Sequence, residues 1–121
     1  MPARNFEATL RHQTEGVIID LSGEIDAAAE TGLGQAYTAA EQAKPSTIIL
    51  NFRDVDYINS TGIALIVGLL AQARKAHCQL KAFGLSDHYA ELFNITRLSD
   101  FMSIFPDESS AVIGSSPATH Q

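Results

Sequence analysis

Residues 47 to 76 read TIILNFRDVDYINSTGIALIVGLLAQARKA, an apolar run, a polar cluster and a longer apolar run in succession. The first run, Thr47 to Phe52, is rich in β-branched residues and predicts a buried strand. Arg53 to Asp56 is polar and predicts a connection. Asn59-Ser60-Thr61 then opens an apolar stretch that predicts a helix to about Ala76.

The flanking segments continue this alternation of strand and helix. Strands are predicted over Phe6–Leu10, Val17–Leu21, Leu80–Phe83 and, at the sheet edge, Met102–Phe105, and helices over Ala27–Ala43, Asp87–Phe93 behind a Ser86 cap, and Pro106–Val112. The first two strands are expected to form an antiparallel hairpin, and Ser22-Gly23 is expected to end the second. Because glycine destabilises a helix by roughly 1 kcal/mol relative to alanine, Gly32 and Gly34 predict irregular first turns. The pattern predicts an α/β fold, a single-layer, mixed, mostly parallel sheet with helices packed on it.

Length and composition predict one folded domain. The 121 residues, 45% apolar and 18% charged, match an ordinary globular chain. We expect the domain to span residues 1–113. Residues 114–121, with Ser115-Ser116-Pro117, predict a flexible tail.

Charge and apolar patterning exclude several classes of protein. The net charge of −6, with eight scattered basic residues, argues against nucleic-acid binding. Gly68 and Gln72 interrupt the longest apolar stretch, which is too short to span a bilayer, and the first residues carry no secretory signal. We therefore expect a cytoplasmic protein. Cys78 is the single cysteine and is predicted to be a buried thiol.

No catalytic or metal-binding pattern appears in the sequence. The histidines, which we expect at the surface or in loops, lie in four separate segments: His12, His77, His88 and His120. Asp54 and Asp56 form a possible carboxylate pair, but a solvated loop is the simpler interpretation. Ser60 has no histidine nearby in sequence and no Gly-x-Ser-x-Gly setting. We expect neither an enzyme nor a bound cofactor.

The residues that open the central helix allow two interpretations. Asn59 or Ser60 could serve only as a cap, accepting hydrogen bonds from the first backbone amides. Alternatively, Ser60 is an exposed switch, because phosphate adds about −1.5 to −2 charges where the helix dipole favours negative charge. Modification would then alter partner binding and leave the fold intact. Gly62 either packs closely or leaves room for a partner's backbone.

Three stretches resemble one known family. Gly23-Glu24-Ile25-Asp26, the strand Ile48 to Phe52, and Asp56-Tyr57-Ile58-Asn59-Ser60-Thr61-Gly62-Ile63 are similar to the anti-sigma factor antagonists of the STAS domain family. The similarity extends from Val17 to Phe105 and includes the Leu92-Phe93 helix. It implies a βα superhelical fold.

The resemblance also implies a mechanism. It implies an antagonist that binds an ATP-dependent serine kinase acting as an anti-sigma factor, is inactivated by phosphorylation of Ser60, and is restored by a PP2C-type phosphatase. Asp26 and the Asn59 to Gly62 tip would face the partner, although Asp26 could equally cap the helix that begins at Ala27. The family usually carries aspartate at the position of Asn59, so the charge beside the Ser60 hydroxyl differs from that in the family. Thr61 is therefore kept as the second candidate for phosphorylation. An accessory subunit of a membrane transporter and a scaffold in a sensory assembly are the alternative functions.

Overall fold

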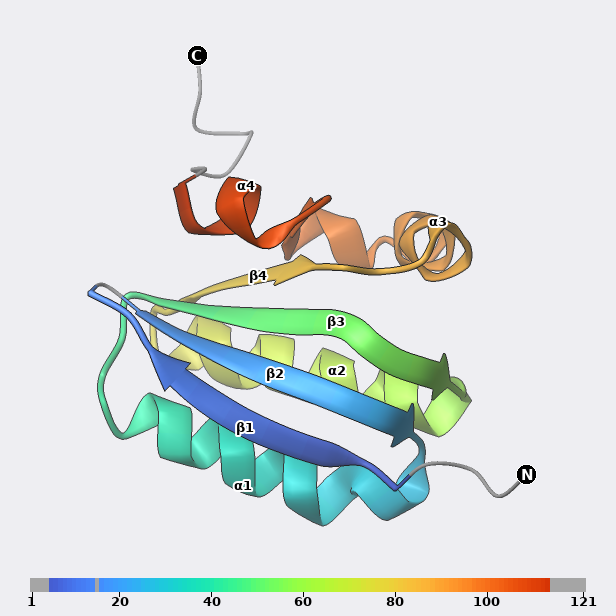
Figure 1. Cartoon of the computed structure of the whole chain (residues 1–121), viewed down its shortest axis with the longest axis horizontal. Helices are drawn as coiled ribbons and strands as arrows, with labels where there is room; N and C mark the ends of the chain where they lie inside the picture. The colour runs from blue at the N-terminus through green and yellow to red at the C-terminus, as the bar shows by residue number, and fades with distance from the viewer. Residues whose placement is uncertain (1–4, 15, 114–121) are drawn as a thin grey trace.

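Strands and helices follow one another along the chain, beginning with two consecutive strands (Figure 1). The structure is a computed structural model that describes residues 5–14 and 16–113. The strands are β1 (Glu7–His12), β2 (Gly16–Ile25), β3 (Thr47–Ile58), β4 (Gln79–Phe83) and β5 (Ser103–Phe105). The helices are η1 (Ala27–Ala29), α1 (Glu30–Glu41), α2 (Ser60–Lys75), α3 (Asp87–Ile95), η2 (Leu98–Asp100) and α4 (Glu108–Ile113), where η denotes a 3-10 helix. The predicted tail and His120 lie outside the described residues.

The strands follow one another in the sheet in the order β1-β2-β3-β4-β5. β1 runs antiparallel to β2, whereas each later neighbouring pair is parallel. This arrangement confirms the predicted hairpin, the mixed, mostly parallel sheet and the last strand at its edge. The terminal helix is also present, although it begins at Glu108, after Pro106.

Two strands, β2 and β3, extend well past the ends that the sequence predicted. Ser22-Gly23 does not end β2, and Arg53 to Asp56 is not a connection, because it belongs to β3. The pairing of the two strands shifts register between Asp20 and Ser22 and again after Gly23, and each shift adds one residue on β3. Such β-bulges interrupt the alternation of inward and outward side chains, so the polar stretch resembles a loop in sequence.

The predicted helix over residues 27–43 is divided into η1 and α1. Its first turn is irregular, as expected, but this turn precedes Gly32 and Gly34, which both lie within regular α1. Asp26 caps the 3-10 turn, since its Oδ1 accepts a hydrogen bond from the Ala28 amide at 3.0 Å. The glycines therefore did not cause the irregularity.

The sheet buries apolar side chains on both faces. Val17, Ile19 and Leu21 belong to the larger core, which includes residues of α1 and α2. Alternate positions such as Ile18 and Ile49 belong to a smaller cluster with Ala111 of α4. Cys78 is 8% exposed and confirms the predicted buried thiol. None of the helices within the described ranges is long and apolar enough to cross a membrane.

Candidate functional site

The start of α2 is fixed by Asn59, which the sequence had left as one of two possible caps. The Asn59 side-chain Oδ1 accepts a hydrogen bond from the Gly62 amide at 2.8 Å, and its carbonyl accepts one from the Ile63 amide at 2.9 Å. Ser60, the first residue of the helix, is exposed, as is Thr61. The cap is thus provided by the asparagine, and both candidate acceptor hydroxyls lie at the surface.

Gly62 allows α2 to approach the end of β2. A Cβ atom at this position would lie 2.0 Å from the Ile25 carbonyl oxygen and 3.0 Å from the Ile58 Cγ2 atom. Neither distance is compatible with ordinary packing, and Gly62 is buried. Of the two roles considered for this glycine, the structure shows close packing.

The register of two parallel strands brings Asp26 next to the tip of α2. Ile25, the last residue of β2, pairs with Ile58, the last residue of β3. The Asn59 amide donates a hydrogen bond to the Ile25 carbonyl at 3.3 Å, so the chain segments that leave the two strands run side by side. The residues predicted for the partner-facing surface, Asp26 and Asn59 to Gly62, therefore lie at one edge of the sheet.

Tyr89, on α3, is a residue of this region that the sequence did not indicate. Its hydroxyl accepts a hydrogen bond from the Ile58 amide at 3.0 Å, one residue before Asn59. The sequence predicts that Tyr89 lies in the helix over Asp87–Phe93, but nothing in the sequence links its hydroxyl to an amide 31 positions earlier.

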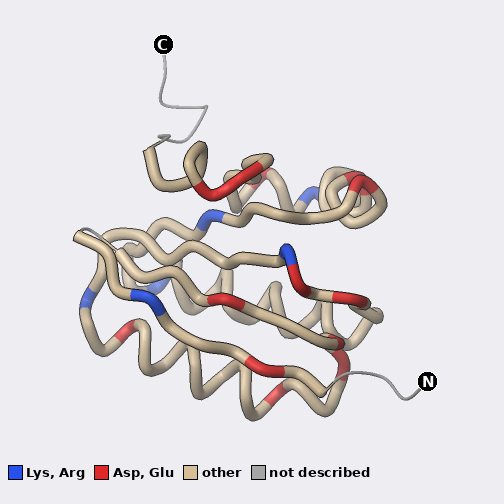
Figure 2. Tube along the Cα trace, in the orientation of Figure 1, with Lys and Arg blue, Asp and Glu red and all other residues tan. Residues whose placement is uncertain are grey.

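Acidic residues lie in the two strands that end beside the tip of α2 and in the turn after β2. Figure 2 shows Asp and Glu gathered where β2 and β3 end, and the residues responsible include Glu24, Asp26, Asp54 and Asp56. The first turn of α2 itself has no acidic residue, whereas its last turn carries Arg74 and Lys75. The positive end of this helix dipole is therefore not matched by a charge within its own first turn.

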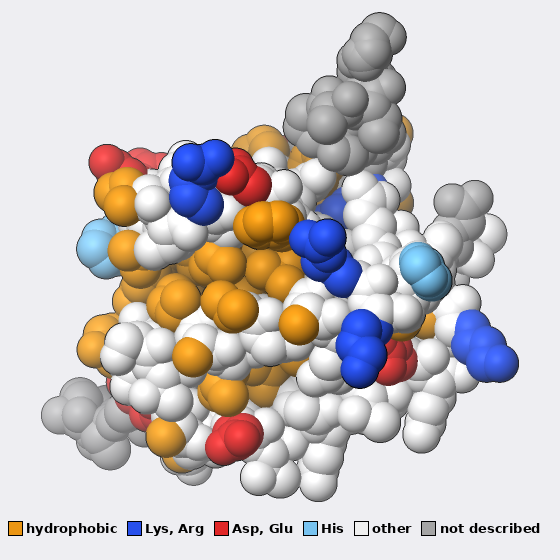
Figure 3. Space-filling view, turned by 180° about the vertical axis from the view of Figure 1, so that it is seen from behind, with side chains coloured by type: hydrophobic (Ala, Val, Ile, Leu, Met, Phe, Trp, Pro, Cys, Tyr) orange, Lys and Arg blue, Asp and Glu red, His pale blue; other side chains and the backbone are white. Residues whose placement is uncertain are grey.

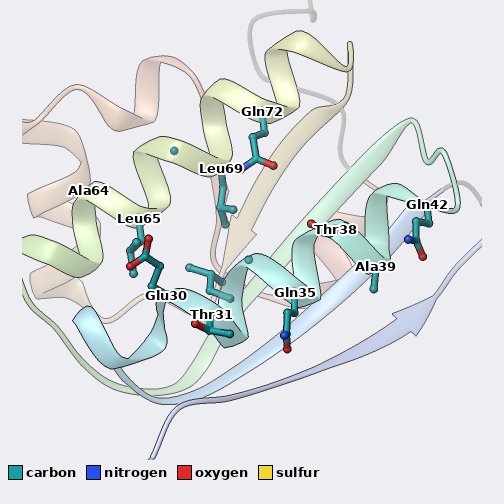
Figure 4. Close-up of a pocket in the computed structure, with 13 residues that line it drawn as sticks. Glu30, Thr31, Gln35, Thr38, Ala39, Gln42, Ala64, Leu65, Leu69 and Gln72 are labelled. Atoms are coloured by element: carbon teal, nitrogen blue, oxygen red, sulfur yellow. The ribbon is translucent and has the colours of Figure 1, made fainter.

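A groove of about 660 Å³ runs between α1 and α2 (Figure 4). Leu65 and Leu69 point from α2 towards α1, and Glu30 and Gln35 of α1 line the other side. Ala64, also in the lining, lies four residues after Ser60 and hence on the same side of the helix. The surrounding face is rich in apolar side chains (Figure 3). The groove thus begins about one turn from the candidate acceptor.

The remaining candidates from the sequence do not form a site. His12, His77 and His88 are exposed, as expected, and Asp54 and Asp56 are exposed on β3. In the part of the chain that the structure describes, no three His, Cys, Asp or Glu residues are arranged to hold a metal ion.

Comparison with known proteins gives matches over most of the chain. The family model of the STAS domain matches residues 7–111. An anti-sigma-B factor antagonist of Listeria monocytogenes is 33% identical over 91 residues, which are 75% of this chain and 80% of that protein. An anti-sigma-B factor antagonist of Staphylococcus aureus is also 33% identical, over 83% of this chain and 91% of its own length.

Solved structures share the fold at lower identity. An anti-sigma factor antagonist from Mycobacterium paratuberculosis has a TM-score of 0.79 and 16% identity, covering 90% of this chain and 92% of that one. The Bacillus cell fate determinant SpoIIAA in its phosphorylated form has a TM-score of 0.68 and 24% identity, covering 88% and 96%.

Proposed function

This chain belongs to the STAS domain family, and we propose that it is an anti-sigma factor antagonist switched by phosphorylation of Ser60. In its unmodified form it binds an anti-sigma factor that is also a serine kinase. The kinase transfers the γ-phosphate of ATP to the Ser60 hydroxyl, and the complex dissociates. The chain is therefore a kinase substrate and a binding protein, without catalytic activity of its own.

One observation carries the proposal. Ser60 is exposed on the first turn of a helix whose cap is supplied by a different residue, Asn59, in a chain similar to anti-sigma-B factor antagonists. Because the Ser60 hydroxyl is not needed for capping, it can be modified without loss of a hydrogen bond that stabilises the helix. The deep packing of Gly62 against β2 holds the helix tip in place before and after modification.

Phosphorylation would change the surface more than the fold. The phosphate adds about −1.5 to −2 charges to an end of the sheet that already carries Asp26 and Glu24. The helix dipole stabilises that charge locally, by typically 0.3–1 kcal/mol at an exposed terminus. A partner that fits the unmodified tip would meet a larger group with about −1.5 to −2 charges, and an acidic side chain of the partner opposite that group would cost several kcal/mol.

The test combines the purified chain with each anti-sigma serine kinase encoded in the same genome, in the presence of ATP. We expect mass spectrometry to locate phosphate on Ser60, and binding of the phosphorylated chain to its kinase to weaken at least tenfold, which is about 1.4 kcal/mol. Treatment with a PP2C-type phosphatase should restore binding.

Matched variants separate Ser60 from its neighbour. Ser60→Ala should bind the kinase and accept no phosphate, whereas Thr61→Ala should still be phosphorylated. Ser60→Asp should bind more weakly, although it carries one charge and fewer acceptor oxygens than phosphate. Equal phosphorylation of wild type and Ser60→Ala, or unchanged binding after modification, would overturn the proposal. Co-purification with a membrane transporter or with a large assembly would favour the accessory or scaffold alternatives.

A further inference from the structure

The last part of β3 extends past its neighbour on one side. β4 pairs with β3 from Thr47 to Asn51, and Phe83, the last residue of β4, is opposite Asn51. β2 continues to pair with β3 as far as Ile58 on the other side. Backbone amides of β3 beyond Asn51 that point towards β4 therefore lie past the end of that strand and need acceptors other than its backbone carbonyls.

Side chains satisfy two of these amides. The Arg53 amide donates to the Asn51 Oδ1 atom at 2.9 Å, and the Ile58 amide donates to the Tyr89 hydroxyl at 3.0 Å. The second bond lies directly before Asn59, and Ile58 is only 4% exposed. A buried amide that loses its acceptor destabilises the fold, so the Tyr89 hydroxyl stabilises the end of β3 by accepting this hydrogen bond.

Tyr89 is itself held firmly on α3. Its backbone amide donates to the Ser86 cap, and Phe93, one turn later, packs edge to face against Phe52 of β3 with ring centroids 6.0 Å apart. Tyr89 and Phe93 thus fix the same side of α3 against β3. The hydroxyl is therefore carried by a helix that is capped at Ser86 and packed against β3.

We infer that Tyr89 is a positioning residue for the phosphorylation switch. Its hydroxyl holds the end of β3 and so sets the place at which the chain turns into Asn59 and Ser60. This role rests on the proposed function, because it assigns to Tyr89 the presentation of Ser60 to the kinase. It requires no contact between Tyr89 and the kinase.

The variant Tyr89→Phe tests the role, because it keeps the ring and removes the hydroxyl. We expect NMR to show that the Ile58 and Gly62 amides exchange with solvent about tenfold faster, which corresponds to the free energy of one hydrogen bond. Amides at the start of β3 should exchange as slowly as in the wild type. The kcat/KM for phosphorylation of Ser60 should fall about tenfold at a temperature where both proteins are fully folded.

Tyr37→Phe is the matched control. The Tyr37 hydroxyl is buried on α1 and, among residues 5–14 and 16–113, makes no hydrogen bond to β3 or α2, so its removal should leave amide exchange at Ile58 and Gly62 and kcat/KM unchanged. Unchanged exchange at Ile58 in Tyr89→Phe, or faster exchange spread evenly over the sheet, would overturn the positioning role. So would an unchanged kcat/KM.

The two measurements also separate this inference from the function on which it rests. If no kinase phosphorylates the wild-type chain, the proposed function fails. The exchange of Ile58 and Gly62 then still decides whether the Tyr89 hydroxyl fixes the helix tip.

Discussion

Asn59 caps the helix whose first residue, Ser60, is the proposed phosphorylation site. The family resemblance leads us to expect aspartate at this position, and the Asn59 Oδ1 atom accepts the hydrogen bond from the Gly62 amide. An asparagine caps a helix about as well as an aspartate but contributes no negative charge to the positive end of the dipole. The structure therefore separates two properties that an aspartate would combine.

Two substitutions measure these properties separately. Asn59→Ala should lower the free energy of unfolding by about 1 kcal/mol, because the Gly62 amide loses its acceptor. Asn59→Asp should keep the cap and raise the free energy of unfolding by about 0.3–1 kcal/mol at neutral pH and low salt. Urea denaturation followed by circular dichroism provides the measurement. If Asn59→Asp proves as unstable as Asn59→Ala, the hydrogen bond seen in the structure does not cap α2.

Gly62 and Gly68 lie on one helix but in opposite steric surroundings. A Cβ atom at position 62 would meet the Ile25 carbonyl oxygen at 2.0 Å, whereas nothing lies within 4 Å of one at position 68. Gly62→Ala should therefore lower the free energy of unfolding by about 1–3 kcal/mol through overpacking. Gly68→Ala should raise it by roughly 0.5–1 kcal/mol, because alanine favours the helix.

Each of the two variants is the control for the other, because both replace glycine by alanine in the same helix. Thermal unfolding of the two variants should shift in opposite directions. If both variants are stabilised, helix propensity alone governs the two positions, and the close approach of α2 to β2 is not rigid.

At the scale of whole elements, hydrophobic period and capping residues were good guides. They placed α2 within a residue of its observed ends, located the hairpin, and identified Ser86 as the cap of α3. Local rules succeed there because each element obeys its own period from end to end. The same rules wrongly predicted a connection at Arg53 to Asp56. These residues belong to β3, where two bulges interrupt the alternation of buried and exposed side chains.

The contacts that complete the site depend on how elements meet. The packing of Gly62 on the Ile25 carbonyl depends on the register of β2 and β3, and the role of Tyr89 depends on β4 ending before β3 does. Neither fact is encoded locally, so the sequence could indicate which residues form the tip but not what holds it. The family resemblance pointed to Ser60 as the candidate acceptor, and the geometry shows that Ser60 is exposed and that Asn59 supplies the cap.

At the scale of the molecule, the end of the sheet and the face covered by α4 carry different groups of charged residues. The edge where β2 and β3 end presents the candidate switch and its acidic surroundings (Figure 2). The face covered by α4 carries a charged cluster instead. Arg11 of β1 makes paired hydrogen bonds of 2.6–3.0 Å to Asp20 of β2 and to Glu108 of α4.

This cluster makes stability depend on pH. Hydrogen bonds from Arg11 lower the pKa of Asp20 and of Glu108 below their ordinary values. Near pH 4 and below, the unfolded chain then binds more protons than the native chain, so acid favours unfolding. The stability that Arg11 contributes is complete above the carboxyl pKa of the unfolded chain, about 4, and is lost as the pH falls through the lower native values.

Arg11→Met removes the guanidinium and keeps much of its apolar stem. Because all three side chains are partly exposed, we expect the variant to be less stable by only about 0.5–1 kcal/mol at pH 7. Urea denaturation from pH 7 to about pH 2 should show this difference shrinking below about pH 4, as the carboxylates of the wild type become protonated. A difference that stays constant over that range would mean that Arg11 stabilises the attachment of α4 by packing alone. Ser60 lies at the end of the sheet where β2 and β3 end, outside this cluster. Phosphorylation of Ser60 should therefore be equally efficient in the wild type and in Arg11→Met at pH 7.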